Sequence, residues 1–79
     1  MNPEQRARLV AGCAEQLGVE PAELTEDLDF FEDLNLDRSD LADLLVMLED
    51  ALATSLEDGI RAVRTFGDLE TLVEDALSA

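Results

Sequence analysis

The sequence predicts an all-α fold, a four-helix bundle of three main helices and one short helix with a long first loop. Apolar residues recur at helical spacing in three segments, and each segment begins at a residue that can cap a helix. No run of alternating β-branched residues indicates a strand. A chain of 79 residues has only one thin core, so we expect residues 1–79 to form a single domain.

The first helix is predicted to begin within the first few residues. Asn2 can cap it, Pro3 suits its first position and Gln5 completes a capping box. Gly18 supplies the left-handed residue that ends it. The apolar face is expected to consist of Leu9, Val10, Cys13 and Leu17.

Residues 19–36 form a long connection that Pro21 prevents from continuing the first helix. Loops of this length are uncommon unless they are packed or functional. The segment is also too apolar for a solvated linker. We therefore predict a packed loop with a single turn near residues 21–24, held by Phe30 or Phe31 and by Leu34.

The central helix is predicted from about residue 38 to residue 53. Asp37 is its N-cap candidate, with Asp40 three residues later. Its apolar face consists of five leucines, Leu41, Leu44, Leu45, Leu48 and Leu52.

Two further segments follow the central helix. Residues 56–63 form a short piece that is too short to stand without tertiary packing. Thr65 then caps the last helix with Asp68 at its third position. The apolar face of that helix contains Phe66, Leu69, Leu72, Val73 and Leu77.

The charge balance restricts the possible functions. Twenty acidic residues face five arginines, with no lysine and no histidine, for a net charge of −15. Such a chain repels nucleic acid and anionic membranes, so a basic protein surface is the natural partner. Without histidine the usual general base is missing, and we expect no catalytic residues and no enzyme activity. We also expect a monomer.

Cys13 cannot form an internal disulfide, and we assign it to core packing. Since no apolar run approaches the length of a membrane span and no signal peptide is present, we expect a cytoplasmic protein.

Acidic residues also raise the possibility of a calcium loop. Asp33, Asn35, Asp37 and Ser39 fall at the first, third, fifth and seventh positions of an EF-hand. The sixth position, which needs glycine, is Arg38, and the twelfth, which needs glutamate, is Leu44. We therefore predict no dedicated metal site.

Four carboxylates lie on or near one face of the central helix. This set, Asp40, Asp43, Glu49 and Asp50, is typical of a docking surface for arginines and lysines, and equally of a solvated helix face.

The chain resembles the acyl carrier protein family in four places. Residues 17–25 (LGVEPAELT) and residues 31–37 (FEDLNLD) follow the family pattern before the central helix, and Leu48, Glu49 and Asp50 follow it within that helix. Residues 65–69 (TFGDL) are similar to the start of the family's last helix. Each motif is weak alone, but their order and spacing are fairly specific.

The resemblance implies a four-helix carrier rather than a catalyst. In that family a serine within Asp-Ser-Leu receives 4′-phosphopantetheine from coenzyme A through a phosphopantetheinyl transferase, and the thiol of the arm holds acyl groups as thioesters. The preceding aspartate helps the transferase to bind magnesium, and the acidic helix docks on basic patches of synthase and transferase enzymes.

This sequence departs from the family at the attachment motif. Aligned without gaps, Asp37 matches the aspartate, but Arg38 occupies the serine position and Asn35 replaces the usual glycine. In one interpretation Ser39 carries the arm one position late and Asp37 assists. That register requires a one-residue deletion later in the helix, which would rotate the rest by roughly 100°. In the other, the gapless register holds and no arm is attached.

The predicted function is therefore a carrier of acyl intermediates in fatty-acid, polyketide or related biosynthesis. The alternative is an arm-free adaptor or structural subunit that presents its acidic helix to a basic partner.

Overall fold

The computed structural model describes residues 1–78, apart from the side chain of residue 57, and confirms the all-α fold. Three α-helices, α1 (Pro3–Leu17), α2 (Arg38–Leu52) and α3 (Phe66–Ser78), are joined through two short 3₁₀ helices, η1 (Pro21–Glu23) and η2 (Glu57–Ala62). Within the described range the only β-type pairing is an isolated antiparallel bridge between Asp29 and Thr65.

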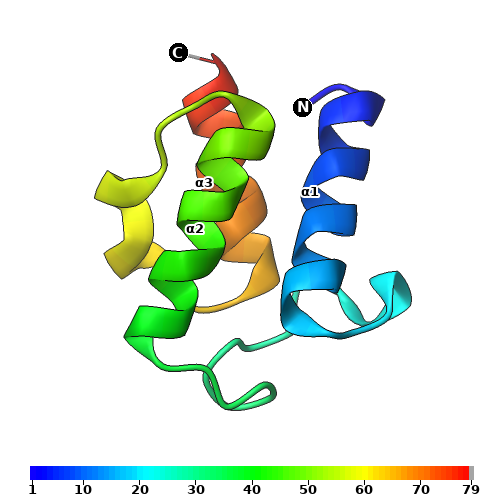
Figure 1. Ribbon diagram of the computed structural model, residues 1–79, viewed down its shortest axis with the longest axis vertical. Helices are drawn as coiled ribbons and strands as arrows, with labels where there is room; N and C mark the ends of the chain where they lie inside the picture. Colours follow the sequence, from blue (N-terminus) through cyan, green and yellow to red (C-terminus); the bar gives the residue numbers. More distant parts are fainter. Residues whose placement is uncertain (79) are drawn as a thin grey trace.

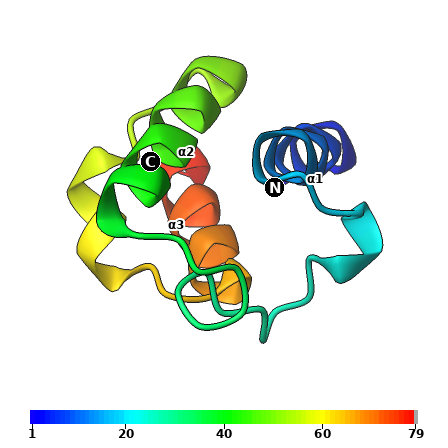
Figure 2. The ribbon, with the colours of Figure 1, turned by 60° about the horizontal axis from the view of Figure 1, so that its bottom comes forward.

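The three α-helices lie side by side along the long axis of the molecule (Figure 1). Helix α1 runs opposite to α2 and α3, while α2 and α3 point the same way because η2 crosses back between them (Figures 1 and 2). This crossing by η2 makes α2 and α3 parallel neighbours, while α1 is antiparallel to both. The long connection closes the end of the bundle at which α2 and α3 begin.

Local capping explains where the helices begin and end. The Asn2 side chain accepts the Gln5 backbone N–H, the Gln5 side chain accepts the Asn2 N–H, and Gly18 ends α1 in the left-handed conformation. At α3, Thr65 Oγ1 accepts the Asp68 N–H, and Asp68 accepts the N–H groups of Arg64 and Thr65. The predicted caps of both helices are confirmed.

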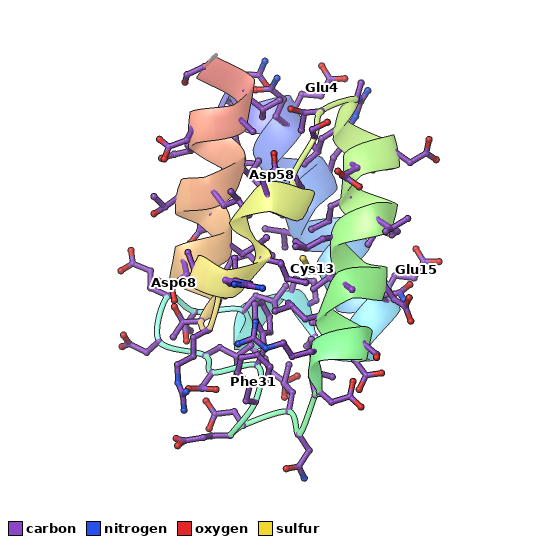
Figure 3. The ribbon with its side chains drawn as sticks, turned by 90° about the vertical axis from the view of Figure 1, so that its left-hand side faces the viewer. Glu4, Cys13, Glu15, Phe31, Asp58 and Asp68 are labelled. Carbon is purple, nitrogen blue, oxygen red and sulfur yellow. The ribbon has the colours of Figure 1, made fainter. Side chains whose placement is uncertain are left out.

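The core lies between the three helices and is entirely apolar in the described residues. All five leucines predicted for α2 are buried, as are Leu9, Cys13, Phe66, Leu69 and Val73. Figure 3 shows Cys13 in the interior, and burial raises the pKa of its thiol to about 12. The thiol therefore stays protonated, which fits a packing role.

Residues 19–36 are attached to the bundle through Phe30, which is fully buried. The Phe30 N–H donates to the Arg64 carbonyl at 2.9 Å, and the Phe66 N–H donates to the Leu28 carbonyl at 2.9 Å. Phe31 is only half-buried, so Phe30 is the anchor of the predicted packed loop. The predicted turn near residues 21–24 is η1.

Arg64 holds the same connection from outside. Its Nε donates to Asp29 Oδ2 at 2.7 Å, its Nη2 donates to Glu32 Oε1 at 3.2 Å, and its guanidinium lies 6.0 Å from the centre of the Phe31 ring. The other Asp29 oxygen accepts the N–H groups of Phe31 and Glu32. The Glu32 N–H bond and the further bonds from Phe31 and Arg64 hold the pKa of Asp29 below its ordinary value, against a smaller opposing effect of desolvation.

Asp29→Asn should lower the urea midpoint at neutral pH more than Asp50→Asn, an exposed control that removes the same charge. Because the folded protein depresses the pKa of Asp29, its contribution is present above the unfolded pKa and is lost as the pH falls through the folded pKa. The difference between the two variants should therefore disappear in strong acid. A difference that persists at a pH below the folded pKa would contradict this assignment.

Helix α2 connects to η2 through a short, well-bonded turn. Ala53 ends α2 in the left-handed conformation, with a φ of 53°, and the Leu56 N–H donates to Glu49 Oε2 at 2.8 Å. Segment η2 then packs on α3, where a Cβ on Gly59 would overlap the Leu72 side chain. This contact places η2 over the seam between α2 and α3 (Figure 3).

Candidate functional site

The start of α2 holds the two residues predicted to bind the prosthetic group. The Asp37 side chain accepts the Asp40 N–H at 2.8 Å, and Asp40 accepts the Asp37 N–H at 3.2 Å, which forms a reciprocal capping box. Ser39 is the second residue of the helix and is exposed, as are Asp37 and Arg38. The hydroxyl of Ser39 thus lies at the positive end of the α2 dipole and is open to solvent.

The outward face of α2 follows from its buried leucines. Successive residues are rotated by roughly 100°, so Ser39, Asp43, Val46 and Asp50 lie opposite the leucine face. All four are exposed. Among the described residues Val46 is the one exposed large apolar side chain, with 56% of its surface accessible to solvent. Sequence reasoning missed Val46, although its helical position opposite the leucines could have identified it.

Arg38 lies on a different flank of the same helix. Helical spacing puts it in line with Ala42, Leu45 and Glu49. Because Glu49 bonds to Leu56 and a shallow groove is lined by Ala42, Leu45, Val46 and Ile60, this flank faces η2. The first two residues of α2 therefore point in different directions: Arg38 toward η2 and Ser39 away from the bundle.

The four carboxylates predicted to form a docking surface differ in their exposure. Asp40, Asp43 and Asp50 are exposed, and Asp40 and Asp43 also line a small cavity with Gln16, Leu17 and Leu36 at the α1–α2 seam. Glu49 is half-buried, and its carboxylate accepts the Leu56 N–H. The first three remain a predicted docking surface, whereas Glu49 has a structural bond in the free protein.

The backbone conformation at position 35 explains why asparagine can replace the glycine of the family pattern there. Its φ of 56° lies in the left-handed region, where glycine is most easily accommodated and asparagine is among the best-tolerated alternatives. The chain therefore keeps the backbone turn before α2 although the residue differs.

Among the side chains that the structure describes, no group of three or more Cys, Asp or Glu residues could hold a metal ion. No described helix is long and apolar enough to cross a membrane.

Comparisons with known proteins relate this chain to acyl carrier proteins over most of its length. Residues 7–73 match the sequence model of a family described as "Phosphopantetheine attachment site". The acyl carrier protein of Chlamydia trachomatis is 39% identical over 62 residues, which cover 77% of this chain and 80% of the relative. The acyl carrier protein of Chlamydia felis is 35% identical over 75 residues, or 94% of each chain. The meromycolate extension acyl carrier protein of Mycobacterium leprae is 31% identical over 71 residues, which cover 84% of this chain and 62% of the relative.

Proposed function

Because the chain belongs to the acyl carrier protein family, whose prosthetic group is 4′-phosphopantetheine, we propose that Ser39 is the residue to which that group is attached. Proteins of this family are carriers rather than catalysts, and this chain is a carrier of acyl intermediates in fatty-acid or related biosynthesis. The observation that carries the Ser39 assignment is its exposed hydroxyl in the first turn of α2.

The residues around Ser39 fit a phosphodiester. The first-turn N–H groups of a helix favour an anion, and the adjacent Arg38 adds a guanidinium that can bond phosphate oxygens. In the described residues Arg38 has no ion pair, so this cation is available. The group, once bound, would supply the thiol that holds an acyl chain, while the protein tethers that chain and raises its effective concentration at a partner enzyme.

Asp37 has a second role in this proposal. Its carboxylate already caps α2, which fixes the position of the helix start relative to the connection. We assign it the additional role of helping the transferase bind magnesium, through lone pairs that the Asp40 N–H does not use.

Ser39→Ala should abolish the gain in mass that follows coexpression with a broad-specificity phosphopantetheinyl transferase. The matched control is Ser55→Ala, which removes an exposed hydroxyl outside the helices and should be modified like the wild type. Intact mass measures the yield, and tandem fragmentation locates the adduct.

An unmodified wild-type chain, in a tube where an ordinary acyl carrier protein is fully converted, would contradict the Ser39 assignment. An adduct on any residue other than Ser39 would do the same.

The exposed carboxylates Asp40, Asp43 and Asp50 form the proposed docking surface for basic patches of the transferase and of synthase enzymes. Val46 lies on the same outward face and supplies an apolar contact in the middle of the charges. Charge pairs at the rim of an interface act mainly on the rate at which the two proteins associate, so their effect should weaken as the salt concentration rises.

Asp43→Lys should slow modification of Ser39 by about tenfold at low ionic strength, because it places a cation on the face that meets a basic enzyme. The control is Glu15→Lys, the same charge reversal at an exposed position of α1. Initial rates by mass spectrometry at low and high salt measure the effect. If both variants slowed modification equally, the effect would come from the change in net charge rather than from this surface.

A second candidate function rests on Arg38. In the gapless register Arg38 stands at the family's attachment position, and a chain that is never modified could still present its acidic surface to a basic partner. That adaptor predicts an unmodified mass together with salt-sensitive binding that Asp43→Lys weakens. We further propose that the chain acts as a monomeric, single-domain carrier in the cytoplasm.

A further inference from the structure

A small pocket, here called the seam pocket, lies between α1 and α2 near the start of α2. Its volume is about 180 Å³. Two of its lining side chains are apolar and three carry an amide or a carboxylate: Leu17 and Leu36, and Gln16, Asp40 and Asp43. Within the described part of the chain, the side chains of Gln16 and Asp43 have no hydrogen bond or ion pair. These two groups are therefore available to a ligand.

The position of Ser39 on α2 brings the seam pocket within one helical turn of its hydroxyl. Side chains three and four residues apart are neighbours on a helix. The neighbours of Ser39 in the next turn are Ala42, which lines the apolar groove beside η2, and Asp43, which lines the seam pocket. From position 38 the same spacing leads to Leu41, which is buried, and to Ala42. The one-residue shift of the hydroxyl therefore gives access to a pocket that position 38 does not adjoin.

The chemistry of the arm decides between the two hollows beside Ser39. The groove beside η2 is lined by apolar side chains alone. Beyond its phosphate, 4′-phosphopantetheine carries geminal methyl groups, a hydroxyl and amide groups before it reaches the thiol. Burying a hydroxyl or an amide without a hydrogen bond costs free energy, whereas carboxylate oxygens accept O–H and N–H groups. This part of the arm therefore favours the seam pocket.

The volume of the seam pocket limits how much of the arm it holds. A cavity of about 150 Å³ is enough to hold benzene, so this pocket accepts one segment of the arm and not its whole length. The pantoyl unit, which follows the phosphate, is the segment that can reach a pocket one turn from Ser39. The phosphate itself stays outside, because Asp40 and Asp43 repel it while Arg38 and the first-turn N–H groups attract it.

We propose that the pantoyl segment of an arm on Ser39 lies in the seam pocket, with its geminal methyl groups against Leu17 and Leu36. Its hydroxyl and amide groups bond to Gln16 and Asp43. This assignment rests on the attachment to Ser39 proposed above. It makes the end of α1 part of the site that holds the arm, and it directs the rest of the arm away from η2.

The test uses the full chain, uniformly isotope-labelled and modified by the transferase from unlabelled coenzyme A. Isotope-filtered nuclear Overhauser effects (NOEs) then connect protons of the arm to protons of the protein. The geminal methyl protons should show NOEs to the methyl groups of Leu17 and Leu36 and none to those of Ile60. Comparison with the unmodified chain should show larger amide shift changes at Leu17 than at Ile60, two residues that are both distant from Ser39 in the sequence.

Intact mass separates the two ways in which this experiment can fail. A chain that gains no mass would contradict attachment to Ser39 itself. A chain modified at Ser39 whose arm shows NOEs to Ile60, or to no side chain of the protein, would overturn the seam pocket and leave the attachment standing.

A variant of the attachment position tests the geometric argument. Arg38→Ser/Ser39→Ala, which carries the arm at position 38, should lose the NOEs to the two leucines of the seam pocket. The reason is that the helix turns this position by roughly 100° away from the α1 side. NOEs that persist with the arm at position 38 would overturn the proposal.

A pair of variants on α1 tests the lining of the seam pocket. Gln16→Ala should weaken the NOEs to Leu36 by about twofold or more, the effect of one lost neutral hydrogen bond on an equilibrium. The matched control is Glu15→Ala, the neighbouring exposed residue that does not line the pocket, and it should leave the NOEs unchanged. Both variants should still gain the full mass of the arm. Equal NOE intensities in the two variants would overturn the role assigned to Gln16.

Discussion

Phe30→Ala should destabilise the protein by about 3–5 kcal/mol, the usual cost of removing a fully buried phenylalanine. Total stabilities of small domains are about 5–15 kcal/mol, so the variant should be close to unfolded at 37 °C. Phe30 is fully buried even though it belongs to the long connection rather than to a helix. Its backbone N–H donates to the Arg64 carbonyl and its carbonyl accepts the Leu36 N–H, so Phe30 is also held in place by its backbone.

Urea unfolding followed by circular dichroism measures this effect, and Phe31→Ala is the matched control. Phe31 is the neighbouring residue, but it is only half-buried: its ring packs against the edge of the core and lies 6.0 Å from the Arg64 guanidinium. Partial burial removes less apolar area from water than full burial, and an exposed cation–π contact contributes only about 0.5–1 kcal/mol, so the control should lose less stability than Phe30→Ala. Equal losses would mean that the connection is held by its hydrogen bonds rather than by the buried ring.

The helices could be predicted because their signals are local. Asn2, Gln5 and Gly18 define the ends of α1, and the leucine spacing defines the buried face of α2. The choice between Phe30 and Phe31 could not be made from the sequence, since adjacent residues in a loop have no periodicity to tell them apart. That choice depends on contacts between residues more than thirty positions apart. These contacts are the bridge between Asp29 and Thr65 and the bonds to Arg64.

At the candidate site, too, the features set by neighbouring residues could be predicted, and those set by distant contacts could not. The capping box of Asp37 and Asp40 and the exposure of Ser39 follow from a short stretch of sequence. The half-buried state of Glu49 depends on the turn to Leu56, and the groove beside Arg38 depends on where η2 crosses back. Helical periodicity places a residue on a face, but tertiary packing determines what covers that face.

The double variant Arg38→Ser/Ser39→Ala should be modified at position 38 at least about tenfold faster than the wild type is modified at Ser39. Moving the hydroxyl by one residue rotates it by roughly 100° toward the η2 flank and places it directly after Asp37. The change also removes a guanidinium that would repel a magnesium ion bound by the transferase beside Asp37. A tenfold difference in rate corresponds to about 1.4 kcal/mol, the size expected for one displaced charge contact at a partly exposed site.

A time course of intact mass with one transferase preparation measures both rates, and fragmentation confirms the modified position. Ser39→Ala alone is the control that should show no adduct, and circular dichroism checks that Arg38→Ser leaves the exposed start of α2 folded. Faster modification at position 38 would show that the shifted position of Ser39 lowers the rate of attachment in the wild type without preventing it. Equal rates would mean that the transferase tolerates either register. If neither the double variant nor the wild type were modified, the start of α2 would be removed as an attachment site and the adaptor would be favoured, since a hydroxyl in either register would then not be sufficient for attachment.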